Sequence, residues 1–249
     1  MSTPAPTLDA ELALASCCGP GRRIVVGIDE VGRGALAGPV AMGACAIEVI
    51  DGRAAALPED VRDSKLLTAR RREALVAPIR ESILAGSVGW ASAAEIDEIG
   101  IIRALTRAAV RAIDALAIDI DAIVLDGNVD VLSAELARAA DGARPTPVVE
   151  LRVAADRDCA SVAAASILAK VARDAEMVAL DALAPDYCWA SNKGYGSAAH
   201  RRAIETLGVH EHHRRSWRLG TTPLDAPEPS RAGVLWDDQW HPQHEEERR

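Results

Sequence analysis

The 249-residue sequence contains no phenylalanine, and aromatic residues make up only 3% of it. A hydrophobic core must therefore be built from Ala, Val, Ile and Leu, whose small side chains allow helices and strands to pack closely. No uncharged apolar run reaches the roughly 18 residues that a membrane-spanning helix needs, which excludes such a span. Residues 1–20 lack a basic segment followed by an apolar run, so we expect no secretory signal.

Cysteine is also scarce. The five cysteines form no C-x-x-C pair, and their odd number argues against a disulfide framework. These features favour a reducing, cytoplasmic location. The net charge of −9 is unusual for a protein that binds nucleic acid. However, basic residues are concentrated in segments 62–81 and 193–218, and local basic surfaces attract phosphates even on an acidic protein.

Apolar runs predict three strands in succession, in residues 22–34, 38–50 and 87–96. After these strands, segments in which apolar residues recur at helical spacing alternate with two further predicted strands. The predicted helices cover 66–84, 96–116, 159–183 and 197–207, and the later strands cover 122–128 and 147–153. This order predicts an α/β fold in which a three-strand antiparallel meander is followed by parallel strands, with helices on both sides.

Three segments are expected along the chain. Residues 1–20 are predicted to be a flexible, loosely docked N-terminal arm. Residues 21–220 are predicted to form the folded body, with a C-terminal helical part at about 185–220. Residues 221–249 are Pro-rich and charged, which predicts a disordered acidic tail.

Four acidic residues stand where apolar strands meet turns or helices: Asp29 and Glu30 in IVVGIDEVG, Asp126 in AIVLDGN, and Asp156 after ELRVAA. Carboxylates at the ends of central strands are costly to bury unless a cation compensates them. Neighbouring strands would bring the four together, and hard oxygen ligands without a Cys or His cluster favour Mg²⁺ or Mn²⁺ over Zn²⁺. Each acid taken alone could instead serve a turn or a helix cap.

Asp29 and Glu30 pose a geometric problem, because neighbours on a regular strand point to opposite faces. Three arrangements would bring both to one metal site. The strand could bulge near Gly32, Glu30 could contribute its carbonyl, or its side chain could reach around the edge of the sheet.

Three further motifs suit contacts with a sugar–phosphate chain. Gly32-Arg33-Gly34 combines permissive backbone with a cation, Asp63-Ser64-Lys65 offers a hydroxyl and an ammonium, and Lys193-Gly194-Tyr195-Gly196 places a ring between glycines. Each has an ordinary structural alternative: a hairpin turn, the approach to a helix, and a buried tyrosine. The first motif is not a nucleotide-binding loop, because it matches neither G-x-x-x-x-G-K-[ST] nor G-x-G-x-x-G.

A cluster of basic residues follows, formed by His210, His212, His213, Arg214 and Arg215. The cluster could be a zinc patch, although no cysteine or suitably spaced partner accompanies it. We favour a solvated face that binds phosphates, because histidine and arginine side chains together suit a negatively charged backbone.

Six motifs follow one another over roughly residues 24–218: GIDEVGRGALAGPV, RDSK, LDGN, ASVAAASILAKVARD, NKGYGS and EHHRRSW. Their content and order resemble the bacterial ribonuclease HII family. The resemblance implies an RNase H-like fold with a C-terminal helical part. It also implies an endoribonuclease that hydrolyses the RNA strand of RNA–DNA hybrids, nicks duplex DNA 5′ of an embedded ribonucleotide, and thereby serves ribonucleotide excision repair.

The same resemblance makes Asp29, Glu30, Asp126 and Asp156 the catalytic residues and the ligands of two Mn²⁺ or Mg²⁺ ions. Two-metal-ion hydrolysis would leave 5′-phosphate and 3′-hydroxyl ends. The substrate-binding residues would be Gly32, Arg33, Gly34, Ser64, Lys65, Lys193 and Tyr195. The glycine–arginine turn would sense the ribose 2′-OH, Tyr195 would stack at the RNA–DNA junction, and Ser64 and Lys65 would contact a phosphate. We expect a monomer whose partners are RNA–DNA hybrids and DNA containing single ribonucleotides.

The sequence departs from the family pattern at three points. Ala154-Ala155 precedes Asp156 where a Lys or Lys-Gly is usual, Arg62 replaces an Asn, and Trp217 replaces a Phe. Two other functions stay open: another metal nuclease of the same fold, such as a junction resolvase, and a non-catalytic hybrid-binding protein. The GRG and KGYG motifs argue against the first, and the presence of all four acids argues against the second.

Overall fold

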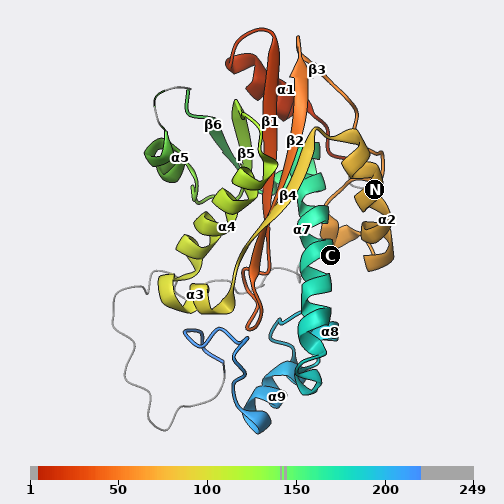
Figure 1. Ribbon diagram of the computed structural model, residues 1–249. Helices are drawn as coiled ribbons and strands as arrows, with labels where there is room; N and C mark the ends of the chain where they lie inside the picture. The colour runs from red at the N-terminus through yellow and green to blue at the C-terminus, as the bar shows by residue number, and fades with distance from the viewer. Residues whose placement is uncertain (1–4, 141, 143–144, 220–249) are drawn as a thin grey trace, which may run out of the picture.

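The computed structural model describes residues 5–140, 142 and 145–219 (Figure 1). Within them, one open mixed sheet has the strand order β3-β2-β1-β5-β6, and β4 also pairs with β2. The strands are β1 (Arg22–Val31), β2 (Val40–Ile50), β3 (Arg53–Ala54), β4 (Ala85–Ala91), β5 (Ala122–Asp126) and β6 (Val148–Arg152). The antiparallel meander of β1, β2 and β4 and the parallel set of β1, β5 and β6 confirm the predicted fold.

Helices cover both faces of this sheet. In the described residues they are α1 (Asp9–Cys17), α2 (Ala69–Ser82), α3 (Ala93–Ile99), α4 (Ile101–Leu116), α5 (Ser133–Ala139), α6 (Ala155–Asp158), α7 (Ala160–Asp181), α8 (Trp189–Asn192) and α9 (Ala198–Leu207). A capping box between Ser92 and Glu95 begins α3. The helix predicted over 96–116 is divided at Gly100, whose φ of 79° is left-handed and ends α3.

Helix α7 packs closely against β1 and β2. A Cβ added at Gly27 would lie 2.4 Å from the backbone N of Val162, and one at Gly43 would lie 2.2 Å from the carbonyl O of Ala165. Glycine on the strands and alanine on the helix therefore permit an approach that larger side chains would block. The small alanines at 163–165 lie in this contact, which places the first half of α7 directly behind the second half of β1.

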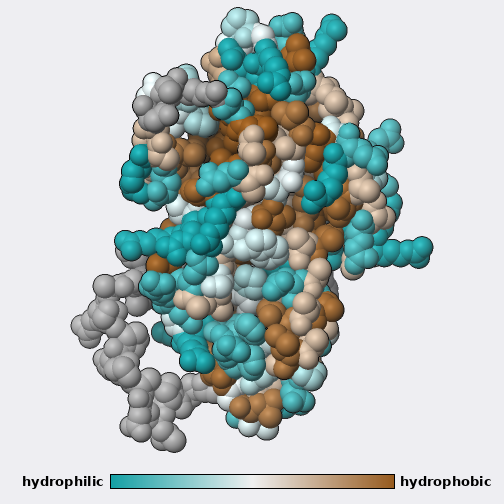
Figure 2. Space-filling view, in the orientation of Figure 1, coloured by the Kyte–Doolittle hydropathy of each residue, from teal (hydrophilic) through white to brown (hydrophobic). Residues whose placement is uncertain are grey.

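Helix α4 covers the opposite face, where it packs against β2 and β4 and shares a hydrophobic core with Ile24, Val26 and Ile28 of β1. Side chains alternate along a strand, so Asp29 belongs to the α7 face and Glu30 to the α4 face. The outer side of α4 carries arginines that pair with Glu95, and Figure 2 shows a hydrophilic belt over this helix. Basic groups therefore occur locally on a protein whose net charge is negative.

The N-terminal segment differs from its prediction. Helix α1 packs against the body, and its Glu11 and Leu14 are buried. Glu11 Oε1 accepts hydrogen bonds from Ser161 N at 2.8 Å and from Ser161 Oγ at 2.7 Å, at the start of α7. Because α7 has no side-chain cap of its own, Glu11 supplies one from another helix. Residues 9–17 are therefore not a loosely docked arm.

Helices α8 and α9 lie beyond the lower end of α7 in Figure 1 and have their own small core around Trp189 and Ile204. They fall in the segment 185–220 that was expected to be helical. No helix in the described residues is long and apolar enough to cross a membrane. All five cysteines are free thiols. The acidic tail predicted for 221–249 lies outside the described residues.

Candidate active site

Three of the predicted acids meet at one end of the sheet, where β1 and β5 finish. Parallel pairing of β1 with β5 continues up to the residues just before Asp29 and Asp126, so both carboxyl groups lie at the same edge. Asp126 Oδ1 accepts a hydrogen bond from Ala155 N at 2.7 Å. This bond holds the first turn of α6 against the strand end and brings Asp156 beside the other two acids.

Glu30 approaches these acids from the other face. A bulge near Gly32 was one of the three arrangements considered. The β1–β2 register runs without interruption through Val31, so no bulge occurs in the strand before Gly32. Burial raises the pKa of Glu30, Asp126 raises it further, and Arg33, whose Nη1 lies 3.4 Å from Glu30 Oε1, lowers it. Because Asp126 acts on the Glu30 carboxyl group, the arrangement in which the Glu30 side chain reaches around the edge of the sheet is favoured. We call Asp29, Glu30, Asp126 and Asp156 the acid cluster.

The acid cluster holds more negative charge than its surroundings compensate. Burial, reinforced by Asp126, Asp156 and Glu30, raises the pKa of Asp29 to about 8. Burial also raises the pKa of Asp156, while Lys65, whose Nζ lies 3.6 Å from Asp156 Oδ2, opposes this shift. Among the described residues, the buried Asp156 Oδ2 has no hydrogen-bond partner. A buried carboxylate oxygen that has an ion pair with Lys65 but no hydrogen bond, placed among several carboxylates, belongs to a donor set that a divalent cation would complete.

Two further residues belong to this site that sequence reasoning did not select. Ser166 of α7 hydrogen-bonds to Asp29, which lowers the pKa of that carboxyl against the effect of burial, and Ser166 Oγ lies 2.8 Å from Ser64 Oγ. Asp63 is buried beside Asp156 and raises its pKa. In the sequence, Ser166 stands in a run of small residues that close packing alone explains. Asp63 gave a usable signal, because it precedes the Ser-Lys pair that was selected.

The predicted phosphate-binding residues occupy different environments. Ser64 is only 3% exposed, so its hydroxyl supports the acid cluster from within the protein. Lys65 is exposed beside Asp156, where its ammonium is accessible to a phosphate. It thereby supplies a cation near the acids, which Ala154-Ala155 do not. The ammonium of Lys193 donates a hydrogen bond to Ala190 O, in the α8 helix that precedes it.

The Gly32–Gly34 turn and the loop that carries Tyr195 lie side by side. Leu36 N donates to Gly194 O at 2.8 Å, which joins the two segments. Tyr195 is 38% exposed, and Arg173 Cζ lies 5.5 Å from the centroid of its ring. An exposed ring held next to the turn is available for stacking on a base or sugar.

The predicted basic face at 210–215 is partly buried. His213 and Arg214 are fully buried, so the expectation of a solvated phosphate-binding face is wrong for both. His213 Nε2 lies 3.1 Å from His200 Nε2, and the ring of Tyr187 packs against His213. Burial lowers the pKa of His213 to about 4. This part of the cluster is a packed core of neutral rings.

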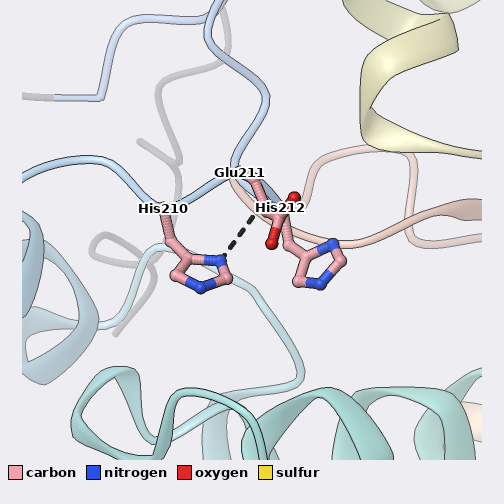
Figure 3. A group of neighbouring side chains, drawn as sticks. All are labelled: His210, Glu211 and His212. Carbon is pink, nitrogen blue, oxygen red and sulfur yellow. Dashed lines mark hydrogen bonds between the residues drawn. The ribbon is translucent and has the colours of Figure 1, made fainter.

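The remaining histidines of that cluster lie nearer the surface. Figure 3 shows the rings of His210 and His212 on the same side of their loop, with the Glu211 carboxylate between them. One ligand atom of each residue lies within 4.8 Å of the other two. His210 Nδ1 accepts a hydrogen bond from His212 N at 3.3 Å, which leaves Nε2 as its outward nitrogen. This group is not the set of three histidines of the zinc alternative, because His213 is buried against His200 and Glu211 stands in its place.

Comparisons with known proteins point to one family. The family model described as Ribonuclease HII matches residues 26–219. A protein named Ribonuclease HII from Laribacter hongkongensis is 46% identical over 195 residues, covering 78% of this chain and 91% of the relative. Another from Streptomyces avermitilis is 40% identical over 212 residues, covering 85% and 83%. The crystal structure of ribonuclease H2 from Pyrococcus horikoshii OT3 is similar with a TM-score of 0.62 and 27% identity, covering 79% of this chain and 94% of that one.

Proposed function

The chain belongs to the ribonuclease HII family, and from this premise we propose that its acid cluster cleaves duplex DNA on the 5′ side of an embedded ribonucleotide. The chain is an endoribonuclease of the RNase H type. The observation that supports the site is the convergence of Asp29, Asp126 and Asp156 around a buried carboxylate oxygen that has no hydrogen-bond partner among the described residues.

The enzyme depends on divalent metal ions, and we propose Mg²⁺ or Mn²⁺ held by the acid cluster. The donor chemistry supports these ions, because the cluster offers hard carboxylate oxygens and neither thiolate nor imidazole. When bound, a pair of such cations supplies an activated water and stabilises the negative charge of the leaving 3′ oxygen. Products with 5′-phosphate and 3′-hydroxyl ends would follow.

The protein's own residues then bind and orient the strand. The exposed Lys65 ammonium, next to Asp156, attracts a phosphate at the site of cleavage. Arg33 pairs with Glu30 in the free protein and can turn to a phosphate once a cation compensates that carboxylate. Ser166 orients Asp29 through its hydroxyl.

Substrate choice depends on the paired loops. The Gly32–Gly34 turn is placed to sense the ribose 2′-OH, while Tyr195 stacks on the neighbouring sugar. The two contacts together test both sides of an RNA–DNA junction. They support a preference for single embedded ribonucleotides as well as for continuous RNA–DNA hybrids.

The deciding experiment uses four labelled substrates: duplex DNA with one ribonucleotide, an RNA–DNA hybrid, all-DNA duplex and a four-way DNA junction. With Mg²⁺ or Mn²⁺ we expect cleavage of the first two only, with a single cut 5′ of the lone ribonucleotide. Extension of the product by a DNA polymerase checks for its 3′-hydroxyl. Chelation with EDTA should stop cleavage. Cutting of the junction would support the resolvase alternative, and binding without any cleavage would support the non-catalytic one.

Two further properties are part of the proposal. Free cysteines throughout the chain support a reducing, cytoplasmic location. A monomer is expected, because one chain contributes all four acids and both substrate loops. Sedimentation equilibrium at micromolar concentration tests this state, and a dimer mass would contradict it.

A further inference from the structure

We propose that Arg214 is a positioning residue for substrate choice, whose buried guanidinium turns the N–H groups of Arg33 and Gly34 toward the nucleic acid. This role rests on the proposed function and adds to it the residue that holds the ribose-sensing turn in place. Neither its burial nor its contacts follow from the motif in which it occurs.

Arg214 is fully buried and uses three nitrogens on three backbone carbonyls. Its Nη2 donates to Gly32 O at 2.7 Å, Nη1 to Arg33 O at 2.7 Å, and Nε to Gly38 O at 3.2 Å. The ring of Trp217 packs on the guanidinium, with its centroid 4.9 Å from Cζ. In the described part of the chain, Arg214 forms no ion pair with a carboxylate, so the carbonyl dipoles compensate its buried charge.

The direction of these carbonyls fixes the direction of the N–H groups that follow them. In a planar trans peptide, C=O and the next N–H point to opposite sides, and the described residues contain no cis peptide. Because the carbonyls of Gly32 and Arg33 point inward to Arg214, the N–H groups of Arg33 and Gly34 point outward. Neither N–H has an acceptor among the described residues, and Gly34 is exposed. Two free donors on an exposed turn suit a hydroxyl or phosphate oxygen.

Arg173 of α7 extends this arrangement to the loop that follows α8. Its Nε donates to Pro39 O at 2.8 Å, Nη1 to Lys193 O at 3.0 Å, and Nη2 to Ala37 O at 3.3 Å. A Cβ at Gly32 would lie 2.0 Å from Arg173 Nε, so this glycine lets the guanidinium pass directly behind the turn. The two arginines hold both substrate loops before substrate binds, which reduces the entropy lost on binding.

Lysine cannot replace this arrangement, because it offers one nitrogen where the guanidinium fork offers three in a fixed plane. Arg214→Lys therefore keeps the positive charge and releases the turn. The measurement is the affinity of two DNA duplexes that differ by one ribonucleotide, determined by fluorescence anisotropy in Ca²⁺ to prevent cleavage. We expect the preference for the ribonucleotide duplex to fall about tenfold in Arg214→Lys, with affinity for all-DNA duplex within about twofold of wild type. Arg215→Lys, the exposed neighbour, is the matched control and should keep the wild-type preference.

An unchanged preference in a folded Arg214→Lys protein, or an equal loss of affinity for both duplexes, would overturn the positioning role. A wild-type protein without any preference would contradict the proposed function instead, since no ribose sensing would then exist to be lost. Circular dichroism and urea denaturation establish whether Arg214→Lys folds. Should it not fold, Trp217→Leu removes the ring over the guanidinium but keeps an apolar side chain against the hydrophobic clusters that Trp217 contacts, and it is expected to lower the preference about threefold. An unchanged preference in that variant also overturns the role.

Discussion

The acid cluster and the pair of buried arginines near the proposed substrate site differ in how far the protein compensates their charges. In the acid cluster, Asp29 has a raised pKa, and the buried Asp156 Oδ2 has one ion pair with Lys65 but no hydrogen-bond partner among the described residues. In the arginine pair of Arg173 and Arg214, all three nitrogens of each guanidinium donate to backbone carbonyls. Buried charge is tolerated where the protein itself satisfies it and is costly where it does not. The acid cluster is therefore a site that a ligand completes, whereas the arginine pair is part of the scaffold.

Replacing Asp126 tests whether the acid cluster binds metal ions, and we expect it to give the largest effect. Asp126→Asn keeps the acceptor for Ala155 N but removes the negative charge of the carboxylate proposed to bind the metal ions. We expect single-turnover cleavage of an RNA–DNA hybrid to fall more than about 100-fold, while hybrid affinity in Ca²⁺ is retained. Cleavage within about tenfold of wild type, a barrier change of only about 1.4 kcal/mol, would contradict its role as a metal ligand.

Replacing Asp29 tests whether the acid cluster is strained without a cation. Its pKa of about 8 lies above the ordinary value, so the folded protein holds a proton that the unfolded chain releases. The stability of the metal-free protein therefore falls as pH rises from about 4 to about 8. At pH 7, Asp29→Asn should raise the free energy of unfolding by about 2–4 kcal/mol, because one pKa unit corresponds to about 1.4 kcal/mol.

Urea denaturation in EDTA measures this difference, and Mn²⁺ provides its control. Added Mn²⁺ should stabilise the wild type and remove most of the pH dependence, because the cation takes the place of the proton. The same addition should have a much smaller effect on Asp29→Asn. A wild type that is more stable than the variant in EDTA would show that the carboxylate is satisfied by the protein alone.

His213, which packs near the arginine pair, is expected to give the opposite pH dependence. Its pKa of about 4 lies below the ordinary value, so the unfolded chain binds a proton that the folded protein excludes. The free energy of unfolding is unaffected by His213 above about pH 6.5 and decreases as the pH falls toward 4. Between pH 7 and pH 5, protonation of His213 in the unfolded chain should lower the free energy of unfolding by about 2 kcal/mol. His213→Asn keeps an acceptor for His210 N and should lose that part of the pH dependence in urea denaturation. An identical dependence in the variant would assign the acid sensitivity elsewhere.

The same contrast explains what the sequence could predict. The acids follow apolar strands, and this local pattern is sufficient to predict Asp29 and Asp126 at one edge of a parallel sheet. Arg214 stands in a run of basic residues, which is typical of an exposed face, and its carbonyl partners are as many as 182 positions away. Glu11 is similar, because its partner Ser161 lies 150 positions along the chain. When the hydrogen-bond partners of a buried charged residue lie far away in the sequence, no local sequence pattern reveals that the residue is buried.

Ser166 supports the acid cluster from α7, and its replacement gives the smallest effect that we predict for that cluster. It is buried, it hydrogen-bonds to Asp29, and it contacts Ser64 Oγ at 2.8 Å. Its removal should raise the pKa of Asp29 further and weaken the cluster for divalent ions. For Ser166→Ala we expect the Mg²⁺ concentration that gives half-maximal cleavage to rise about tenfold, equivalent to about 1.4 kcal/mol, while saturating Mg²⁺ restores most of kcat.

Ser161→Ala is the matched control. Because Ser161 lies on the same helix but bonds to Glu11, this variant should lower stability without changing the Mg²⁺ concentration at half-maximal cleavage. Equal midpoints in wild type and Ser166→Ala would mean that Ser166 only fills space, and that Asp29 is oriented by the strand alone.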